Sequence, residues 1–235
     1  MKDVLWDKKI GVLAGGTSSE REISLKSGNA VLNALKARGL DVRLIDVDPA
    51  SFMLDIEASR IDLAFIALHG AFGEDGTVQT MLEEKGILYT GSGPDASRDA
   101  MDKIASKKIF MDEGLLVPGY RSVEKGVGMD VSGISIPCVV KPRFEGSSIG
   151  LTIVSEMEQV AGAIEKAFRY NDKVIVEDFI PGREVTVGVL GGTPLEEIEI
   201  NTEEGVYDFK AKYHSTSTEY VVPADIDEDI AVKAK

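Results

Sequence analysis

The stretch Lys141-Pro142-Arg143-Phe144-Glu145-Gly146-Ser147-Ser148-Ile149-Gly150 decides how the rest of this 235-residue chain is interpreted. Apolar runs at 136–140 and 151–154 lead into it and out of it, so it joins two predicted strands. Its glycines and adjacent serines offer backbone N–H groups and short hydroxyls that can cradle a phosphate, and Lys141 adds a positive charge. The same residues also suit the turn of a long hairpin. From the loop alone, both interpretations stay open.

Composition and charge exclude several classes of function. The chain has a formal net charge of −14 at pH 7, which argues against binding to a nucleic-acid backbone. Its 43% of hydrophobic residues suffices for one or two domains with a buried core. No apolar run approaches the roughly 20 residues of a membrane helix, and the single cysteine, Cys138, permits no internal disulfide. We therefore expect a soluble, cytoplasmic protein with no nucleic-acid partner and no membrane partner.

Strands and helices alternate in the first part of the chain. Strands are predicted at 9–14, 41–47, 61–68 and 86–90, and helices from Ile23 to Gly39 and at 77–85. Ser19, with Glu22 three residues later, matches a capping box at the start of the first helix. Such alternation is typical of a doubly wound parallel sheet, which binds ligands beyond the carboxyl ends of its strands. We therefore expect 15–22 and 69–76 to form one edge of a cleft.

The pattern changes beyond residue 93. One helix is predicted at 95–113, a strand at 117–123, a mobile connection at 124–135, a helix at 156–169 and a strand at 174–180. The segments 183–190 and 195–200 then alternate as an antiparallel pair through Gly191-Gly192, and 207–213 is predicted to be a polar and aromatic loop. This change from a parallel to an antiparallel pattern predicts three domains, at 1–93, 94–180 and 181–235.

Several polar residues at the predicted cleft have ordinary explanations as well as functional ones. Glu20 lies in the first turn of a helix, where a carboxylate complements the helix dipole. His69 ends a buried strand, and a lone histidine is more often structural than catalytic. Lys103, Lys141 and Lys212 are three of 26 basic residues, and each alone would be interpreted as solvated surface.

The motifs of the whole chain, taken together, resemble those of D-alanine–D-alanine ligases of the ATP-grasp superfamily. In chain order the motifs are Gly15-Gly16-Thr17-Ser18-Ser19-Glu20-Arg21-Glu22-Ile23-Ser24, Ala67-Leu68-His69-Gly70 with Gly73-Glu74-Asp75-Gly76, Tyr89-Thr90-Gly91-Ser92-Gly93, Met101-Asp102-Lys103, Val140-Lys141-Pro142 with Glu145-Gly146-Ser147-Ser148-Ile149-Gly150, Glu184-Val185-Thr186-Val187, and Tyr207-Asp208 with Ala211-Lys212-Tyr213. They cover nearly the whole chain in the family's order. The resemblance implies an α/β N-terminal domain with a doubly wound parallel sheet, followed by an α+β ATP-grasp fold.

The resemblance implies an ATP-dependent ligase that joins two D-alanines to D-alanyl-D-alanine for peptidoglycan precursor synthesis. In this family ATP phosphorylates one D-alanine carboxylate, and the amine of a second D-alanine attacks the acyl phosphate. Such phosphoryl transfer depends mostly on positioning and charge stabilisation. The expected cofactors are ATP and Mg²⁺ or Mn²⁺, and the expected assembly is a cytoplasmic homodimer.

The family's catalytic and substrate-binding residues carry over onto matching positions of this chain. Glu20 would hold the ammonium of the first D-alanine, in a hydrogen-bonded triad with Ser147 and Tyr213. His69 would lie near the carboxylate of that D-alanine. Lys212 and Tyr213 would belong to a lid, residues 207–213, that closes over the site and excludes water. Tyr213 is also similar to the dipeptide-forming members rather than to those that join D-alanine to D-lactate.

The ATP site implied by the resemblance draws on most of the second half of the chain. Its residues would be Lys103, Lys141, Glu145, Gly146, Ser147, Ser148, Glu177, Phe179, Ile180, Glu184 and Lys212. The first two lysines would hold the phosphates, and the loop 145–150 would close over them. Glu177 and the backbone that follows it would meet the adenine, while Glu184 would bind the ribose hydroxyls.

The family's sequence continues for roughly one further half-lobe, so the last subdomain is expected to be only partly present. That portion normally carries a catalytic arginine and the carboxylates that hold two Mg²⁺ ions, and we expect no metal ligand in this chain. Glu199-Ile200-Asn201-Thr202 mimics part of the metal site, but it precedes the lid and is interpreted as a strand end with a turn. We therefore expect that the 235-residue chain does not complete catalysis alone.

Two alternatives stay open. The chain could be a truncated, inactive copy that kept its nucleotide-binding cleft and lost its metal site. It could also be another carboxylate–amine ligase of the ATP-grasp superfamily, although Glu20 and the pairing of Ser147 with Tyr213 argue against this.

Overall fold

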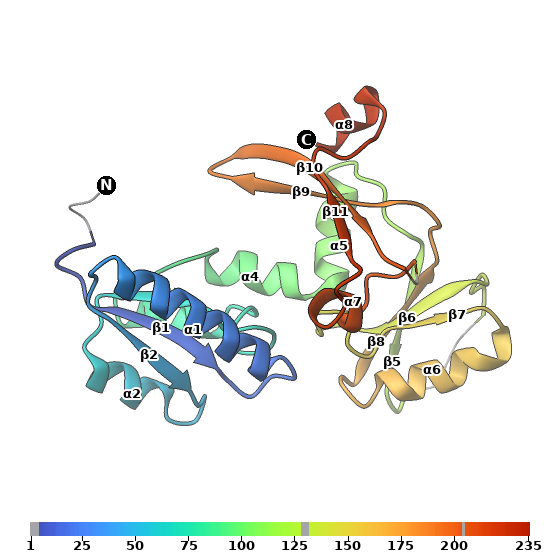
Figure 1. The fold of residues 1–235 in the computed structure, drawn as a ribbon. Helices are drawn as coiled ribbons and strands as arrows, with labels where there is room; N and C mark the ends of the chain where they lie inside the picture. Colours follow the sequence, from blue (N-terminus) through green and yellow to red (C-terminus); the bar gives the residue numbers. More distant parts are fainter. Residues whose placement is uncertain (1–4, 128–131, 204) are drawn as a thin grey trace. The chain divides into compact units, whose positions relative to one another are not determined.

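The chain forms two compact units (Figure 1). The computed structural model describes residues 5–127, 132–203 and 205–235. Unit 1 consists of Met1–Val117 with Arg143–Gly146, and unit 2 consists of Pro118–Pro142 with Ser147–Lys235. Each of the three predicted domains contains one sheet of the part that the structure describes, while the predicted boundaries at 93 and 180 stay a prediction.

Unit 1 is built on a parallel four-stranded sheet of order β2-β1-β3-β4. Its elements are β1 (Ile10–Gly15), α1 (Arg21–Ala37), β2 (Val42–Val47), α2 (Phe52–Ser59), β3 (Leu63–Ile66), α3 (Thr77–Glu84), β4 (Leu88–Tyr89), α4 (Pro94–Met101) and α5 (Lys103–Asp112). Successive side chains of a strand point to opposite faces. Val12 accordingly packs in the core cluster that includes α1, and Leu13 packs in the cluster that includes α2 and α3. Helices on both faces confirm the predicted doubly wound α/β arrangement.

Two local predictions in unit 1 are wrong. The predicted capping box is absent, because Glu20 rather than Ser19 is the N-cap of α1 and no side chain caps this helix. The Ser19 hydroxyl instead donates a hydrogen bond to the Glu145 carboxylate, at 3.1 Å. The single helix at 95–113 is wrong because the chain breaks at Asp102, whose side chain caps the separate helix α5. The helix α2 was also missing from the sequence prediction. All three differences depend on contacts or packing that a short window of sequence does not contain.

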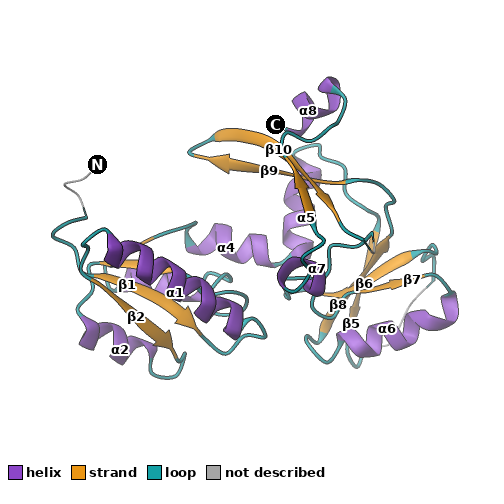
Figure 2. Cartoon of the chain, in the orientation of Figure 1, coloured by secondary structure: helices purple, strands orange, loops and turns teal. Residues whose placement is uncertain are grey.

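Unit 2 holds two antiparallel sheets. The first has the order β5-β8-β6-β7 and is formed by β5 (Tyr120–Glu124), β6 (Cys138–Pro142), β7 (Thr152–Val154) and β8 (Lys173–Asp178). A 3₁₀ turn, η1 (Met157–Gln159), leads into α6 (Val160–Ala167), which lies along one face of this sheet (Figure 2). Val140, Val174 and Ile164 are fully buried between helix and sheet. The predicted mobile connection at 124–135 includes 128–131, which lie outside the described residues.

The second sheet of unit 2 has the order β11-β10-β9. It is formed by β9 (Glu184–Leu190), β10 (Thr193–Asn201) and β11 (Glu219–Val221), and the helices α7 (Phe209–Tyr213) and α8 (Glu228–Ala234) belong to the same region. The β9–β10 pairing confirms the predicted antiparallel pair through Gly191-Gly192. The prediction that residues 207–213 form a loop is wrong in part. Asp208 accepts a hydrogen bond from the Ala211 N–H and caps the short helix α7.

The loop at 141–150 connects the antiparallel strands β6 and β7, so the hairpin interpretation is correct for its ends. Residues 143–150 of this connection are called the flap below. Its backbone is left-handed at three positions, with φ of 49° at Ser147, 59° at Ser148 and 72° at Gly150. Such positive φ values are uncommon for residues other than glycine. The flap is therefore more than a simple turn, since two serines adopt an unfavourable backbone conformation.

Candidate functional site

The N-terminus of α1 places Glu20 in the interior of unit 1. Glu20 is only 3% exposed, and Ser24, one turn further, fixes the strand end because its hydroxyl donates to the Ala67 carbonyl and accepts from the Gly15 N–H. A Cβ added at Gly70 or Gly146 would lie 3.3 Å or 3.1 Å from Glu20 Oε2. The backbone of both glycines therefore approaches the carboxylate closely. Within unit 1 the structure thus brings the predicted residue Glu20 next to the predicted residue Gly146.

His69 lies directly beyond β3, at the edge of the sheet where the sequence predicted a cleft. Its Nδ1 is 3.6 Å from Glu74 Oε1, and this carboxylate, with a smaller contribution from Glu20, raises the pKa of His69 above its ordinary value despite the opposing effect of burial. The other ring nitrogen, Nε2, is buried and has no hydrogen-bond partner among the described residues. A buried polar atom without a partner is costly, so Nε2 is a candidate for contact with a bound ligand.

Lys103, the first residue of α5, contacts the part of the flap that belongs to unit 1. Its ammonium donates to the Glu145 carbonyl at 2.5 Å and to the Arg143 carbonyl at 3.4 Å. Burial raises the pKa of the Glu145 carboxyl, the hydrogen bond from Ser19 opposes this rise, and nearby Glu20 adds to it. Two residues predicted for the ATP site, Lys103 and Glu145, are therefore brought together.

A cavity of about 550 Å³ lies in unit 1 beside these residues. Its walls come from β3, the segment after it, α4 and the flap, and they include Leu68, Glu74, Gln79, Met101, Lys103 and Glu145. The lining is more apolar than polar and includes three charged residues, Glu74, Lys103 and Glu145, as in many small-molecule sites. Of the two segments predicted to form one edge of a cleft, 69–76 contributes Gly73 and Glu74 to this cavity, whereas 15–22 does not line it.

In unit 2, the second part of the flap meets the lid. The hydroxyl oxygens of Ser147 and Tyr213 are 2.9 Å apart. The Ser148 hydroxyl donates to the Tyr207 carbonyl at 3.1 Å and accepts from the Lys212 ammonium at 3.3 Å. The structure therefore brings together the predicted pair Ser147–Tyr213 and the predicted ATP residues Ser148 and Lys212, although flap and lid lie about sixty residues apart in the sequence.

Lys141 and Glu177 form an ion pair on the first sheet of unit 2. Their strands are neighbours, and Lys141 pairs with Ile175 in the register, so Glu177 is its diagonal neighbour on the same face. The side chains are 20% and 8% exposed. The sequence assigned Lys141 to the phosphates and Glu177 to the adenine, and it contained no signal for their contact, which depends on strand register.

The remaining predicted ATP residues follow β8. Phe179 and Ile180 come directly after this strand, and Ile180 is 64% exposed. Glu184 begins β9, and its carboxylate accepts a hydrogen bond from the Tyr207 N–H at 3.4 Å. Tyr207 is thus a residue that sequence reasoning named only within a motif, while the structure shows it in contact with both Ser148 and Glu184.

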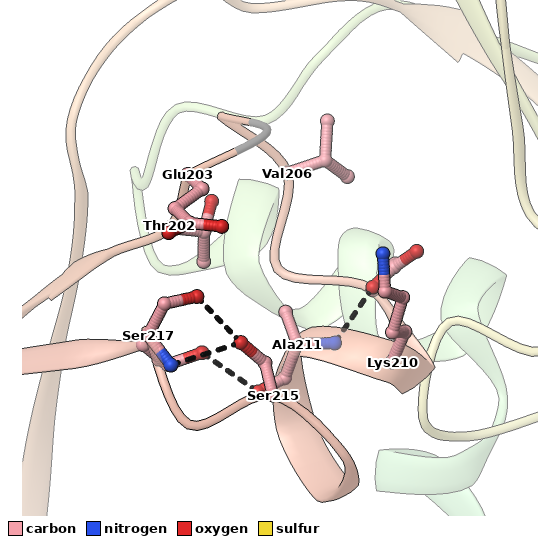
Figure 3. A pocket seen from close by; sticks show the side chains of 9 residues that line it. Thr202, Glu203, Val206, Lys210, Ala211, Ser215 and Ser217 are labelled. Atoms are coloured by element: carbon pink, nitrogen blue, oxygen red, sulfur yellow. Dashed lines mark hydrogen bonds between the residues drawn. The ribbon is translucent and has the colours of Figure 1, made fainter.

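A small cavity of about 60 Å³ lies beside the lid helix (Figure 3). Asp208, Ala211, Ser215, Ser217 and Thr218 contribute to its lining. Figure 3 shows Ser217 and Ser215 turned toward each other, and their hydroxyl oxygens are 2.7 Å apart. A volume of this size holds water rather than a substrate, so we interpret the cavity as a packing gap beside the lid and not as a binding site.

The described residues contain no group of three or more His, Cys, Asp or Glu side chains arranged to hold a metal ion. In the segment that mimics the family's metal site, Glu199 lies within β10 and is held by Arg183, which donates to both carboxylate oxygens at 2.5 Å. Glu199 therefore lies near the end of a strand, as the sequence predicted, and the structure adds Arg183 as its charged partner.

Comparison with known proteins gives one consistent result. Residues 120–235 match the family described as "D-ala D-ala ligase C-terminus", and residues 50–92 match "D-ala D-ala ligase N-terminus". The D-alanine–D-alanine ligase of Syntrophotalea carbinolica is 46% identical over 96% of this chain and 74% of its own length. That of Geobacter sulfurreducens is 48% identical over 94% of this chain and 71% of its own length.

Solved structures agree with these sequence matches. The structure of D-alanine–D-alanine ligase from Bacillus anthracis complexed with ATP has a TM-score of 0.80, with 31% identity, and covers 97% of this chain and 75% of that one. The VanG D-Ala:D-Ser ligase from Enterococcus faecalis has a TM-score of 0.73 with 28% identity, and covers 96% of this chain and 79% of that one.

Proposed function

Because this chain belongs to the D-alanine–D-alanine ligase family, we propose that it uses ATP to join two D-alanines through an acyl phosphate, for peptidoglycan precursor synthesis. The same matches confirm the ATP-grasp ligase fold that the sequence predicted. The single observation that best supports the proposed reaction is the hydrogen bond between Ser147 and Tyr213. It joins the flap to the lid through two residues that the family resemblance assigns to catalysis.

The proposed site for the first D-alanine uses Glu20 and His69. Glu20 would hold the ammonium, and a nearly buried carboxylate is suited to this because it attracts a cation strongly in a medium of low dielectric constant. His69 would meet the carboxylate through Nε2, the buried atom that has no partner among the described residues. We further propose that Glu20 completes a triad with Ser147 and Tyr213 when substrate is bound.

The proposed ATP site uses the two lysines and the flap. Lys103 and Lys141 would exchange their present partners, the flap carbonyls and Glu177, for phosphate oxygens. Glu177, released from Lys141, would accept a hydrogen bond from the adenine, with Phe179 and Ile180 beside it. Glu184 would bind the ribose. Glu145, Gly146, Ser148 and Lys212 would close over the phosphates.

The chemistry of these residues is positioning and exclusion of water rather than nucleophilic attack by the protein. An acyl phosphate hydrolyses readily, so the contacts between flap and lid would protect it until the second amine attacks. The family's Mg²⁺ or Mn²⁺ does not fit any set of described residues, since no group of metal-holding side chains is present and Arg183 already holds Glu199.

The cellular setting is proposed from the family alone, as a cytoplasmic homodimer that binds D-alanine and ATP. In the part of the chain that the structure describes, every helix is too short or too polar to cross a membrane.

Calorimetric titration tests the proposed function. We expect ATP to bind, and D-alanine but not L-alanine to bind in its presence. Glu20→Gln should weaken D-alanine binding by roughly tenfold or more, because the substrate ammonium loses its counter-charge. Glu22→Gln, which changes an exposed carboxylate in the same turn of α1, should leave D-alanine binding unchanged. Equal responses to D-alanine and L-alanine would contradict the proposed substrate.

A phosphate-release assay separates the alternatives. ATP binding without any D-alanine binding would favour the inactive nucleotide-binding copy, and phosphate release stimulated by another amino acid would favour a different carboxylate–amine ligase. The expectation that the 235-residue chain does not complete catalysis alone stays a prediction, and D-alanine-dependent phosphate release from this chain would overturn it.

A further inference from the structure

An ion pair between two residues to which the family resemblance assigns no role, Asp102 and Arg143, attaches the first part of the flap to the start of α5. The Arg143 Nε atom donates to Asp102 Oδ1 at 2.6 Å, and Nη2 donates to Oδ2. The two side chains are only 21% and 14% exposed. A two-pronged contact between guanidinium and carboxylate restricts rotation as well as distance, and it is stronger than a hydrogen bond between neutral groups.

Asp102 has a second task at the same place. Its Oδ1 accepts from the N–H groups of Ile104 and Ala105, at 3.0 Å and 3.4 Å, and so caps α5. Burial would raise the pKa of the Asp102 carboxyl, but the hydrogen bonds from Arg143 and from the two N–H groups outweigh it and leave the pKa below its ordinary value. Asp102 is therefore charged at neutral pH and holds both the helix and the flap.

The contacts of Lys103 depend on this arrangement. Its backbone N–H donates to the Arg143 carbonyl at 3.3 Å, and its ammonium donates to the carbonyls of Arg143 and Glu145. The residue that caps α5 and the residue that begins α5 thus both contact the same four-residue part of the flap. A change in the position of Arg143 would move the carbonyls that now fix the Lys103 ammonium.

We propose that the Asp102–Arg143 pair is a positioning device for ATP binding, which sets the Lys103 ammonium and the first part of the flap in place before the nucleotide arrives. The proposal rests on the proposed function, in which Lys103 holds phosphates. Neither Asp102 nor Arg143 needs to touch ATP for this role. Their contribution is to reduce the freedom that Lys103 and the flap lose when ATP binds.

The variants Asp102→Asn and Arg143→Met test the proposal. Asparagine caps helices as well as aspartate does, so Asp102→Asn removes the charge of the pair and keeps the cap of α5. Both variants should weaken ATP binding by roughly tenfold to a hundredfold, the range for lost hydrogen bonds to a charged group. Binding of adenosine, which lacks the phosphates that Lys103 would hold, should be unchanged. Arg143→Lys, which keeps the charge but loses the two-pronged geometry, should lie between wild type and Arg143→Met.

Two controls make the result specific. Asp95→Asn breaks the exposed Asp95–Arg98 pair on α4 and should leave the ratio of ATP to adenosine affinity unchanged. Lys103→Met should lower the same ratio at least as much as Arg143→Met does. Thermal melting checks that the variants fold, and Arg143→Met, which leaves the cap untouched, serves if Asp102→Asn does not fold.

The positioning role would be overturned if Asp102→Asn and Arg143→Met both kept the wild-type ratio of ATP to adenosine affinity while Lys103→Met lowered it. That result would leave the proposed function intact. Failure of the wild-type chain to bind ATP at all would contradict the proposed function, and this proposal with it.

Discussion

The two parts of the flap differ in what holds them. Arg143–Gly146 belongs to unit 1 and is attached by a charged, two-pronged contact to Asp102. The part that begins at Ser147 belongs to unit 2 and is attached to the lid by neutral hydroxyls, apart from the ammonium of Lys212. Bonds between neutral groups contribute about 1 kcal/mol each, roughly half of what charged ones do. The comparison indicates a fixed first part and a second part that exchanges partners more easily.

The largest effect on the free energy of unfolding is expected at Gly150, where the second part of the flap returns to the sheet. Its φ is 72°, and a Cβ there would lie 2.7 Å from the Tyr170 ring and 2.8 Å from the Pro142 ring. Gly150→Ala adds backbone strain to a clash with two rings, so we expect the free energy of unfolding to fall by about 3 kcal/mol. Urea denaturation measures this loss.

Gly162→Ala is the matched control for that substitution. Gly162 lies inside α6, and apart from its chain neighbours and the backbone of its own helix no atom lies within 4 Å of an added Cβ. Alanine is the better helix former, so this variant should be stabilised by about 0.5–1 kcal/mol. Equal effects at the two glycines would show that the conformation of the flap does not constrain Gly150.

The sequence predicted those features of the flap that depend on short-range patterns. The apolar runs on both sides of 141–150 predicted the two strands that the loop joins, and the alternation of strands with helices before residue 93 predicted the parallel sheet. The family's motifs supplied Ser147 and Tyr213 as a pair. These are cases in which local pattern or motif order carries the information.

Local sequence patterns could not predict contacts whose partners are distant along the chain and are not paired by the family's motifs. The break at Asp102 interrupts a continuous helical pattern, and it is stabilised by Arg143, 41 residues later. The capping box failed because the partner of Ser19 is Glu145, 126 residues away. Lys141 and Glu177 meet only because β6 and β8 pair in one particular register. In each case tertiary packing overrode a local preference.

The Asp102–Arg143 ion pair, which attaches the first part of the flap, should make the free energy of unfolding depend on pH. Because the folded-state pKa of Asp102 lies below the ordinary value for aspartate, about 3.9, its contribution is complete above that pH and is lost as the pH falls through the folded-state pKa. Asp102→Asn should lower the free energy of unfolding by about 2 kcal/mol at pH 7. The difference from wild type should shrink below about pH 4.

Asp46→Asn is the control for the pH experiment. Asp46 forms a similar pair with Arg21, and its pKa is lowered by the same kind of hydrogen bond, but both side chains are about half exposed. Solvent screens such a pair, so the loss at pH 7 should be smaller than for Asp102→Asn. A difference between wild type and Asp102→Asn that did not change with pH would contradict a contribution from the Asp102 charge.

Hydrogen bonds between neutral groups connect Ser148 of the flap to Tyr207, and Tyr207 to Tyr220. Removing the second of these bonds should have the smallest effect on the free energy of unfolding. The Tyr207 and Tyr220 hydroxyl oxygens are 2.8 Å apart, and this hydrogen bond is the main reason why the pKa of Tyr207 rises to about 12. A raised folded-state pKa means that the stabilisation is complete below about pH 10 and is lost as the pH rises through about 12. Tyr220→Phe should lower the free energy of unfolding at pH 7 by less than about 1 kcal/mol.

The ultraviolet absorbance of tyrosinate measures the same substitution directly, and Tyr89 provides an internal reference. The pKa of Tyr89 also rises to about 12, because its hydroxyl donates to Glu83 in unit 1. Wild type should therefore show both Tyr89 and Tyr207 titrating near pH 12, whereas Tyr220→Phe should move Tyr207 alone toward 10, the ordinary value for tyrosine. Glu83→Gln should do the reverse. If Tyr207 still titrated near pH 12 in Tyr220→Phe, burial and the neighbouring groups Tyr213 and Glu184 would be the cause of its raised pKa, and the hydrogen bond to Tyr220 would not be.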